Sequence, residues 1–229
     1  HAAVRQHFPG VQSLGYNCAS FILNATEYGV SQKRERVFFI GFKDNNDPFF
    51  EYHMNDFIER QKNPAPTIRE LLAPLGKAGT KNNPNTCTAK ITFATRPIMR
   101  KSPYAGMYFN GQGRPMCIDG YSNTLPASMG GNKTPFVDEE YLYGDAPEDW
   151  VVAYHKGLMD GSITPEFTEA PSRLRRITIR EAARIQTFPD NYIFCGNKGR
   201  IYTQIGNAVP CKLAEAVAKA VVTYINEQH

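Results

Sequence analysis

The end of the chain, AVPCKLAEAVAKAVVTYIN, repeats apolar residues at the spacing of a single face of an α-helix. The pattern predicts a helix over residues 210–226 with one apolar stripe and one charged face. The stripe consists of Leu213, Val217, Val221, Tyr224 and Ile225, and the opposite face carries Lys212, Glu215 and Lys219. A helix divided in this way has to bury its apolar face, and a sheet is the expected partner.

The beginning of the chain supplies the candidate sheet. The runs SFILNA (20–25) and RVFFIGF (36–42) are apolar and rich in strand-forming residues. A polar connector, TEYGVSQKRER (26–36), separates them. Strands near one end of the chain and a docking helix at the other end indicate α/β packing, with the residues between them inserted.

The inserted segment, from residue 43 to about residue 170, is rich in Asn, Pro, Gly and Thr. Within it, capping and stop signals predict helices at 67–76 and 146–161. Beyond it, a capping box of Thr178 with Glu181 predicts a further short helix. The segment is therefore expected to be an ordered, mixed α and β region rather than a linker.

Charge and composition limit the partners. The 229 residues hold 26 Lys and Arg against 22 Asp and Glu, and the net charge of +4 permits nucleic acid as a partner. Five arginines lie within residues 173–184 and could form a solvated helix face or a surface that contacts phosphate. No apolar run is long enough to span a membrane, so no membrane partner is expected. The five cysteines form no CxxC pair, which indicates free thiols in a reducing cytosol. No Cys/His cluster has the ligand spacing of a metal site, so no metal site is predicted.

Three segments together resemble a known family. They are EYGVSQKRERVFFIGF (27–42), RRITIREAARIQTFPDNY (175–192) and YTQIGNAVPCKLAEAVAKAV (202–221), and they are similar to the last three ordered motifs of the cytosine-5 DNA methyltransferases. In that family the gap between the first and second motifs holds the target-recognition domain. The resemblance implies an α/β fold class: the C-terminal part of a Rossmann-like, S-adenosylmethionine-dependent methyltransferase lobe with an inserted mixed α+β target-recognition domain.

The resemblance also implies an organisation and a reaction. Residues 1–45 would end the catalytic lobe, residues 46–200 would form the target-recognition domain, and residues 201–229 would return to the lobe. In the family a cysteine thiolate attacks a cytosine that is flipped out of double-stranded DNA, and S-adenosylmethionine supplies the methyl group. Such an enzyme is expected in the cytoplasm of a bacterium or phage host, associated with the nucleoid.

The first segment matches the family pattern Gln-x-Arg-x-Arg at Gln32, Arg34 and Arg36. The resemblance implies that Arg36 bonds the cytosine oxygen, Arg34 supports the catalytic pocket and Gln32 holds the loop. Arginine suits a donor role because it stays charged and its donors are fixed in a plane. On composition alone a solvated strand end is the simpler interpretation, and the motif context reverses that preference. Ser31 departs from the family, which usually has proline there.

The third segment implies contacts to S-adenosylmethionine from Asn207, Ala208 and Val209. The sequence GNAVP before a helix predicts a turn with exposed backbone N–H groups, which suits a polar ligand group. An ordinary helix-entry turn is the alternative. Cys211 follows this turn, where a helix start would lower the pKa of a thiol. The nucleophile of the family lies in a Pro-Cys motif earlier in the chain, so Cys211 is expected to be a packing residue.

Several family motifs are not found in the sequence. These are the catalytic Pro-Cys of the N-terminal lobe, the Phe-x-Gly-x-Gly cofactor loop and the Glu-Asn-Val motif. The chain is therefore expected to need an N-terminal catalytic lobe, from the same parent chain or a separate subunit, and to be inactive alone. The alternative is a natural DNA-recognition subunit of a split methyltransferase. A relative that methylates RNA is a further alternative.

Two glycine-rich segments of the insertion carry the side chains that base-edge readout needs. They are NGQGRP (110–115) and SMGGNKTP (128–135). A pair of hairpin turns is the alternative interpretation. The candidate DNA-binding residues are Gln112, Arg114, Ser128, Asn132, Lys133 and Arg180, the last of them toward phosphate or as an organiser of the recognition domain.

Overall fold

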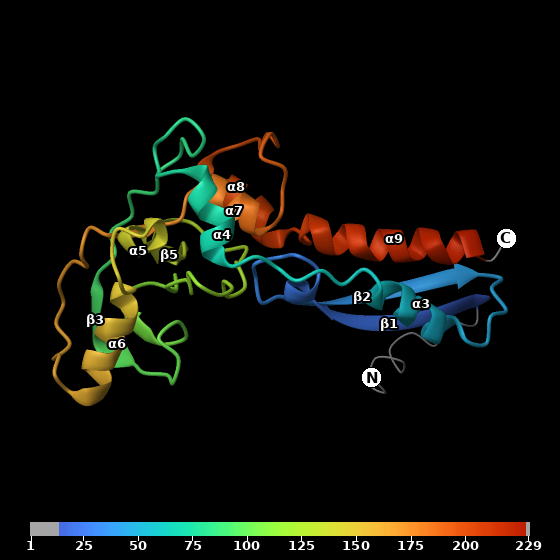
Figure 1. Ribbon diagram of the computed structural model, residues 1–229, viewed down its shortest axis with the longest axis horizontal. Helices are drawn as coiled ribbons and strands as arrows, with labels where there is room; N and C mark the ends of the chain where they lie inside the picture. Colours follow the sequence, from blue (N-terminus) through green and yellow to red (C-terminus); the bar gives the residue numbers. More distant parts are fainter. Residues whose placement is uncertain (1–13, 228–229) are drawn as a thin grey trace.

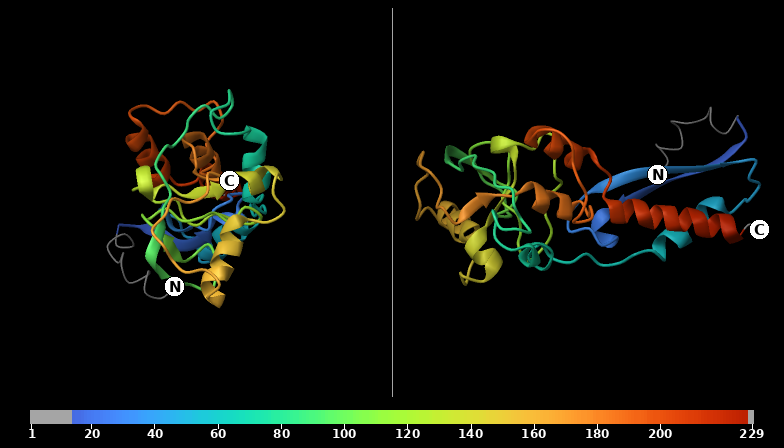
Figure 2. Two further views of the ribbon diagram at one scale, coloured as in Figure 1. Left: turned by 90° about the vertical axis from the view of Figure 1, so that its left-hand side faces the viewer. Right: turned by 90° about the horizontal axis from the view of Figure 1, so that it is seen from above.

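The chain folds around three hydrophobic clusters that follow one another along a long axis (Figures 1 and 2). The computed structural model describes residues 14–227, so residues 1–13 of the expected 1–45 segment lie outside the described part. One end of the molecule combines the first strands with the last helix, as the sequence predicted. The opposite end is built only from the middle of the chain (Figure 1).

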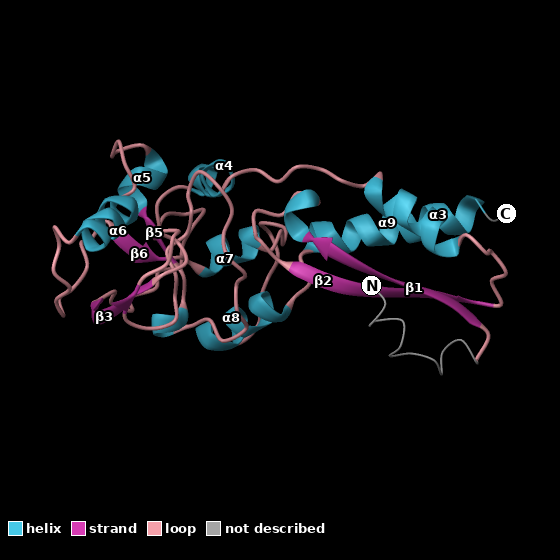
Figure 3. Ribbon diagram, turned by 90° about the horizontal axis from the view of Figure 1, so that it is seen from below, coloured by secondary structure: helices cyan, strands magenta, loops and turns pink. Residues whose placement is uncertain are grey.

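The end that contains both chain-terminal elements is a strand pair covered by two helices. β1 (Tyr16–Asn24) and β2 (Glu35–Lys43) form an antiparallel hairpin. α3 (Phe50–Glu59) and α9 (Cys211–Glu227) share one hydrophobic cluster with the inner face of this hairpin (Figure 3). We call these four elements the hairpin end.

The apolar stripe of α9 is confirmed with one exception. The buried residues are Leu213, Ala216, Val217, Ala220 and Tyr224. Ile225, which was expected in the stripe, is 40% exposed. Twelve residues after Leu213, a helix with about 3.6 residues per turn has rotated roughly a third of a turn away from the stripe. The two alanines fill the positions that the sequence pattern left open.

By sequence α3 lies within the expected recognition domain, but it packs with the hairpin end. Its residues Phe50, Met54 and Phe57 are buried in the same cluster as β1 and α9. The sequence placed residues 46–200 in one recognition domain, but the core of the hairpin end continues through α3. By packing, the chain therefore divides after residue 59 rather than after residue 45. The functions of the two parts stay a prediction.

The outer face of the hairpin carries apolar side chains in contact with solvent. Ile22 and Val37 are direct cross-strand partners, and they are 50% and 46% exposed. Among residues 14–227, β1 and β2 pair only with each other, so each strand has an edge without a neighbouring strand. A two-stranded hairpin of this kind is only marginally stable in water unless something packs against it.

The centre of the molecule is helical. Its elements are α4 (Ile68–Leu72) with the 3-10 turn Ala73–Leu75, α5 (Glu139–Tyr143), α7 (Ile179–Ile185) and α8 (Lys198–Asn207). We call them the helical middle. Both expected capping boxes are present, at Thr67 with Glu70 and at Thr178 with Glu181. α8 was not expected, and it packs in this cluster through Tyr202 and Ile205, so the return to the hairpin end begins with α9 rather than at residue 201.

The far end is an aromatic core. Its elements are β3 (Phe93–Ile98), β4 (Met107–Phe109), β5 (Phe136–Asp138), α6 (Trp150–Asp160) and β6 (Leu174–Arg176). We call them the aromatic end. Trp150 stacks on Tyr154 with ring centroids 4.9 Å apart, and Phe93 lies 4.6 Å from Tyr154. The helix expected at 146–161 begins at Trp150, because the Asp149 side chain caps it, and it ends at Gly161 in the left-handed conformation.

The strand pair β5–β6, which is part of the aromatic end, also contributes to the core of the helical middle. Val137 belongs to the cluster of the helical middle, whereas Phe136 and Leu174 belong to the aromatic cluster. Alternation of side chains along a strand explains this double role. The insertion is thus a mixed α and β region with two cores that share one strand pair. No helix within residues 14–227 is long and apolar enough to cross a membrane.

Candidate functional site

Side chains from distant segments meet where the hairpin end joins the helical middle. Gln32, Arg34 and Gln186 are all buried there. Gln32 Nε2 donates to Gln186 Oε1 at 3.0 Å, and Arg34 Nη1 donates to Gln32 Oε1 at 3.4 Å. The connector between β1 and β2 is therefore bonded to the end of α7, 154 residues farther along the chain.

Arg34 is the centre of this joint. Its guanidinium donates to the carbonyls of Leu125 at 3.2 Å, Gly206 at 2.9 Å and Ala208 at 3.1 Å. Burial, together with the nearby positive charge of Arg36, lowers the pKa of Arg34 to about 10, so the group stays charged at neutral pH. A buried cation with carbonyl partners on two distant segments, at Leu125 and at the end of α8, holds those segments in a fixed arrangement.

Gln186 was not among the residues singled out by sequence. Its Nε2 donates to the Ile205 carbonyl at 2.6 Å, and its own carbonyl accepts the Cys211 N–H at 3.2 Å. It therefore ties α7 to the end of α8 and to the start of α9. The residue lies inside the segment RRITIREAARIQTFPDNY, but a glutamine near a helix end gives no signal of its own before the contacts are known.

Arg36 is placed differently from Arg34. It lies on β2 opposite Leu23 and is partly exposed. Its Nη1 donates to the Glu35 carbonyl at 2.6 Å, and no carboxylate among residues 14–227 forms an ion pair with it. The remaining donors of this guanidinium are available to a ligand. The two arginines are thus neighbours, one built into the joint and the other presented at its surface.

The turn between α8 and α9 differs from the prediction in its backbone. Gly206 and Asn207 belong to the last turn of α8, and the Ala208 N–H is bonded to carbonyls of that helix. At the start of α9, the Cys211 N–H is bonded to Gln186. The prediction that this turn exposes backbone N–H groups is therefore wrong for Ala208 and Cys211. The exposed parts of this turn are Asn207 and the Val209 side chain, which is 41% exposed.

Cys211 has the surroundings of a packing residue. Burial raises the pKa of its thiol, whereas a reactive cysteine at a helix start needs a lowered one. The expectation that the helix start would lower this pKa is wrong, because desolvation outweighs the backbone contact. Among residues 14–227 no group of His, Cys, Asp and Glu is placed so that it could hold a metal ion.

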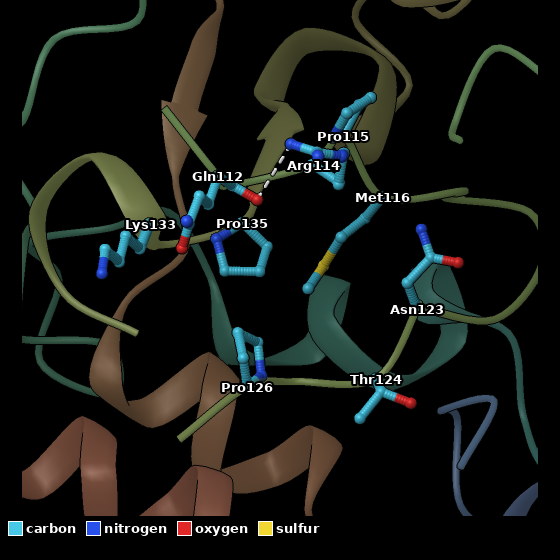
Figure 4. A pocket seen from close by; sticks show the side chains of 9 residues that line it. All are labelled: Gln112, Arg114, Pro115, Met116, Asn123, Thr124, Pro126, Lys133 and Pro135. Atoms are coloured by element: carbon cyan, nitrogen blue, oxygen red, sulfur yellow. Dashed lines mark hydrogen bonds between the residues drawn. The ribbon is translucent and has the colours of Figure 1, made fainter. Parts of the chain in front are cut away.

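The two glycine-rich segments of the insertion come together around one hollow of about 80 Å³ (Figure 4). Gln112 and Arg114 line it from the first segment, and Lys133 lines it from the second. Asn123 and Thr124 face them across the hollow, and sequence reasoning missed both. The hollow therefore collects amide, hydroxyl and cationic groups together with Met116 and three prolines (Figure 4).

The other expected DNA-binding residues lie outside this hollow. Asn132 is exposed beside Lys133, and Ser128 is exposed in the segment before it. Arg180 lines a separate hollow of about 440 Å³ with Arg184 and Lys81. The Arg180 guanidinium reaches only the carbonyls of Pro189 and Tyr192, both at 3.4 Å. Its positive charge is therefore open to a phosphate group.

The arginine cluster at 173–184 does not form a basic surface as a whole. Arg173 pairs with Asp138, Arg175 with Glu181, and Arg184 with Asp190. Arg176 is buried at 2% exposure. Four of the five arginines are therefore used inside the fold, and both interpretations offered by the sequence, solvated face and phosphate surface, are wrong for them. Only Arg180 fits the second.

One short segment links the hollow to the joint. Thr124 Oγ1 donates to the Lys33 carbonyl at 2.7 Å, and the Leu125 N–H donates to Gln32 Oε1 at 2.9 Å. At the next step of this segment, Gly206 of α8 fits closely against the backbone of Pro126 and Ala127, where a Cβ would collide. The wall of the hollow and the connector that carries Gln32 and Arg34 are thus held in one unit.

Comparison with known proteins gives a consistent picture. The C-5 cytosine-specific DNA methylase family matches this chain over residues 3–223. The type II methyltransferase M.MthTI of Methanothermobacter thermautotrophicus is 30% identical over 225 residues, which cover 95% of this chain and 62% of that protein. M.PspPI of Psychrobacter sp. is 32% identical over 225 residues, which cover 94% of this chain and 48% of that protein.

Solved structures match the fold. The crystal structure of the S. pombe Dnmt2 methyltransferase superposes with a TM-score of 0.59 at 14% identity, covering 99% of this chain and 63% of that one. A putative DNA modification methyltransferase from an E. coli prophage superposes with a TM-score of 0.53 at 18% identity, covering 98% and 65%. In all four comparisons this chain spans only part of the longer protein, about half to two thirds of its length.

Proposed function

This chain belongs to the C-5 cytosine-specific DNA methylase family, and on that premise we propose that it is the C-terminal part of an enzyme that methylates carbon 5 of cytosine in a specific duplex sequence. The observation that carries the proposal is the joint of Gln32, Arg34 and Gln186, which brings the three family-like segments together beside the available donors of Arg36. The methyl donor of the family is S-adenosylmethionine.

In this proposal Arg36 acts on the substrate. Attack on carbon 6 of a flipped-out cytosine places negative charge on the ring, and a fixed donor at the ring oxygen stabilises that charge. Arg36 has donors without a carboxylate partner among residues 14–227, so its charge is not neutralised inside the fold. Arg34 and Gln32 hold the backbone from which it projects, and they do not themselves reach the base.

The turn after α8 fits a cofactor with both polar and apolar parts. Asn207 offers an exposed amide and Val209 an exposed apolar side chain, while the Ala208 carbonyl is occupied by Arg34 and, more weakly, by Gln186. We assign Asn207 and Val209 to side-chain contacts with S-adenosylmethionine, and Ala208 to the wall between them. When bound, that molecule supplies the methyl group. The role of this chain is to orient it through a turn that the joint keeps rigid.

DNA sequence is read, in this proposal, at the hollow between the two glycine-rich segments. Gln112 and Arg114 from the first segment and Lys133 from the second present donors and acceptors to it, as base edges in the major groove require. Asn132 and Ser128 lie on the approach to the hollow. Arg180 is available to a backbone phosphate, which positions DNA without reading its sequence.

The nucleophilic cysteine is not proposed to lie in this chain, since Cys211 is the only cysteine preceded by proline and its pKa is raised. A catalytic lobe is therefore required as a partner. The exposed face around Ile22 and Val37 offers it an apolar surface next to unpaired strand edges. Whether that lobe is on the same polypeptide, or whether the chain is a recognition subunit of a split enzyme in the bacterial cytoplasm, is decided by the mass of the protein purified from its source.

A trapping experiment tests the proposal. The protein at its natural length is incubated with S-adenosylmethionine and duplex DNA that contains 5-fluorocytosine, which holds the enzyme on the base because its carbon 5 cannot lose a proton. We expect a covalent adduct on a cysteine outside residues 1–229, and none with an otherwise identical duplex that lacks the fluorine. An adduct on Cys211, or no adduct with any duplex that contains 5-fluorocytosine, contradicts the proposal.

A further inference from the structure

The facing parts of the two glycine-rich segments, residues 110–115 and 130–135, pair along their backbones. We call them the glycine loops. The Gly113 N–H donates to the Asn132 carbonyl at 3.1 Å, and just beyond them the Phe136 N–H donates to the Arg114 carbonyl at 3.2 Å. They are therefore not the two independent hairpin turns that composition allowed. A movement of one loop has to move the other.

Two glycines make this approach possible. Gly111 has φ +87, and a Cβ on it would lie 2.5 Å from the Asn132 carbonyl oxygen. A Cβ on Gly113 would collide with the Thr134 carbonyl and with a guanidinium nitrogen of Arg176. The absence of a side chain at these positions lets the second loop lie directly against the first.

Arg176 locks the pair from the inside. It is among the largest fully buried side chains of the described residues, with Nη1 donating to the Thr134 carbonyl at 2.6 Å and Nη2 to the Lys90 carbonyl at 3.3 Å. Its guanidinium lies 5.6 Å from the centre of the Phe136 ring. Within residues 14–227 no carboxylate pairs with it, and burial lowers its pKa. A buried cation without a counter-ion is destabilising compared with an apolar side chain of similar length.

We propose that the glycine loops form one preformed platform for reading DNA sequence, and that Arg176 is its positioning residue. The inference rests on the proposed function, because it assigns a task to the hollow described above. Arg176 binds the carbonyl of the residue directly after Lys133, while Gly113 lies between Gln112 and Arg114. It therefore sets the spacing between the two sides of the hollow without touching DNA.

Spacing matters because recognition groups act only within about 0.5 Å of their working geometry. A platform that loosens keeps its surface charges, so its affinity for DNA of any sequence persists. What it loses is the difference in methylation rate between the correct sequence and a sequence with one changed base pair. Loss of a residue with a purely structural task would lower the methylation rates on both sequences by the same factor, because less of the protein would be folded.

The test uses the protein at its natural length, with its target sequence first identified from the DNA that it methylates. Methylation rates are measured on that sequence and on duplexes with single base-pair changes. We expect Arg176→Met and Gly113→Ala each to lower the ratio of these rates at least about tenfold, the size of one lost base contact. Arg176→Lys keeps the charge and one carbonyl contact, and should recover part of the ratio. Gly199→Ala in α8, where a Cβ has nothing closer than 3.6 Å, is the matched control.

Hydrogen exchange provides a second measurement that needs no DNA. Amide exchange in residues 110–115 and 130–135 should accelerate at least about tenfold in Arg176→Met, while exchange in α9 stays unchanged. If that variant does not fold, Gly113→Ala carries the test, because it separates the loops without removing a buried charge. An unchanged ratio of rates in a folded variant, or unchanged exchange in the loops, overturns the platform. A wild-type protein that never methylates DNA overturns the proposed function instead, and the exchange measurement still decides the platform.

Discussion

The hairpin end and the aromatic end bury their apolar residues in opposite ways. The hairpin end covers one face of β1 and β2 with α3 and α9 but leaves Ile22 and Val37 half exposed on the other face. The aromatic end encloses its core, with Phe93, Phe136 and Tyr154 all buried. The difference indicates that the insertion completes its own core, whereas the hairpin end leaves apolar surface that a further partner could cover.

The two ends also use arginine differently. Arg173 and Arg175, which flank the aromatic end, are paired with carboxylates and stabilise the fold. Arg36, on the hairpin end, has no such partner among residues 14–227. A charge that is neutralised inside the fold has a structural task, and a charge that is left available can act on a ligand.

The largest expected effect comes from removing the available arginine of the hairpin end, in comparison with an arginine of the inserted segment. In the natural-length protein, Arg36→Ala should lower the turnover number about 100- to 1,000-fold, the usual loss for a donor to a developing negative charge, with little change in DNA affinity. Arg114→Ala should leave turnover on saturating target DNA nearly unchanged and lower sequence discrimination about 10-fold. Single-turnover kinetics and competition binding measure the two quantities.

Equal losses of turnover and affinity in Arg36→Ala would remove the distinction between a chemical and a reading end. So would a loss of turnover in Arg114→Ala that excess DNA does not restore.

The second effect concerns the joint, where the hairpin end meets the helical middle. Arg34→Met leaves the Leu125 and Gly206 carbonyls without this donor and the Ala208 carbonyl with only the weaker contact from Gln186, and should destabilise the protein by about 2–4 kcal/mol. Lys33→Met, at the exposed neighbouring position, is the control and should stay within about 0.5 kcal/mol. Denaturant unfolding followed by circular dichroism measures both. Equal stability of the two variants would mean that the carbonyl contacts of Arg34 do not hold the regions together.

A third effect distinguishes the ends by pH. Burial raises the pKa of Asp149 at the aromatic end to about 6, although the Val151 N–H and the Tyr104 hydroxyl oppose the shift. The folded protein therefore binds a proton on this group more tightly than the unfolded chain does. Stability should fall as pH rises from about 4 to about 6, by at most about 3 kcal/mol.

The hairpin end has the opposite sign. Burial opposes ionisation of Asp47, but hydrogen bonds from His53 and the Phe49 N–H lower its pKa overall. Its stabilisation is present above its ordinary pKa of 3.8 and is lost as pH falls below that value. Unfolding free energies measured from pH 3 to pH 7 should show that Asp149→Asn flattens the slope between about 4 and about 6, and that Asp47→Asn flattens only the acidic limb. A slope that survives in Asp149→Asn contradicts the assignment.

The smallest effect is expected at Cys211. Its thiol is partly buried at the start of α9 and its pKa is raised, so Cys211→Ala removes little more than one sulfur from the packing. We expect stability within about 1 kcal/mol of wild type and unchanged adduct formation with 5-fluorocytosine DNA. Loss of the adduct in this variant would transfer the nucleophile to the hairpin end and reverse the division of tasks proposed here.

The elements that the sequence predicted are those with local signals. The period of α9, the apolar strand-forming runs in β1 and β2, and the capping boxes at Thr67 and Thr178 are written in neighbouring residues. α8 was missed because its sequence KGRIYTQIGN mixes glycine and polar residues, and its helix is stabilised by the packing of Tyr202 and Ile205. α3 was recognised neither as a helix nor as part of the hairpin end, since its partner α9 lies at the other end of the chain.

The same limit applies to the candidate site. Gln32, Arg34 and Arg36 were accessible through a family pattern, but that pattern did not reveal that Arg34 is buried and Arg36 is partly exposed. Gln186 and Thr124 were inaccessible, because their importance lies in contacts to segments far away in sequence. The arginines at 173–184 misled composition-based reasoning, since charge counts do not record which carboxylates the fold brings beside them.

The chain leaves the hairpin end after α3 and returns to it at α9 within one small neighbourhood. A Cβ on Gly29 would lie 3.5 Å from the Asn63 side-chain amide nitrogen, in the segment that leaves the hairpin end. It would lie 3.2 Å from the Lys212 side chain, at the start of α9, where the chain returns. In polymer terms, everything between these points is a closed loop with fixed ends. Because the entropy of closing a loop rises by only about 0.6 kcal/mol for each doubling of its length, the hairpin end can host inserts of very different size. Asn63 and Lys212 therefore mark the ends of an insert whose length the fold can vary, as long as the carbonyl partners of Arg34 within it are kept.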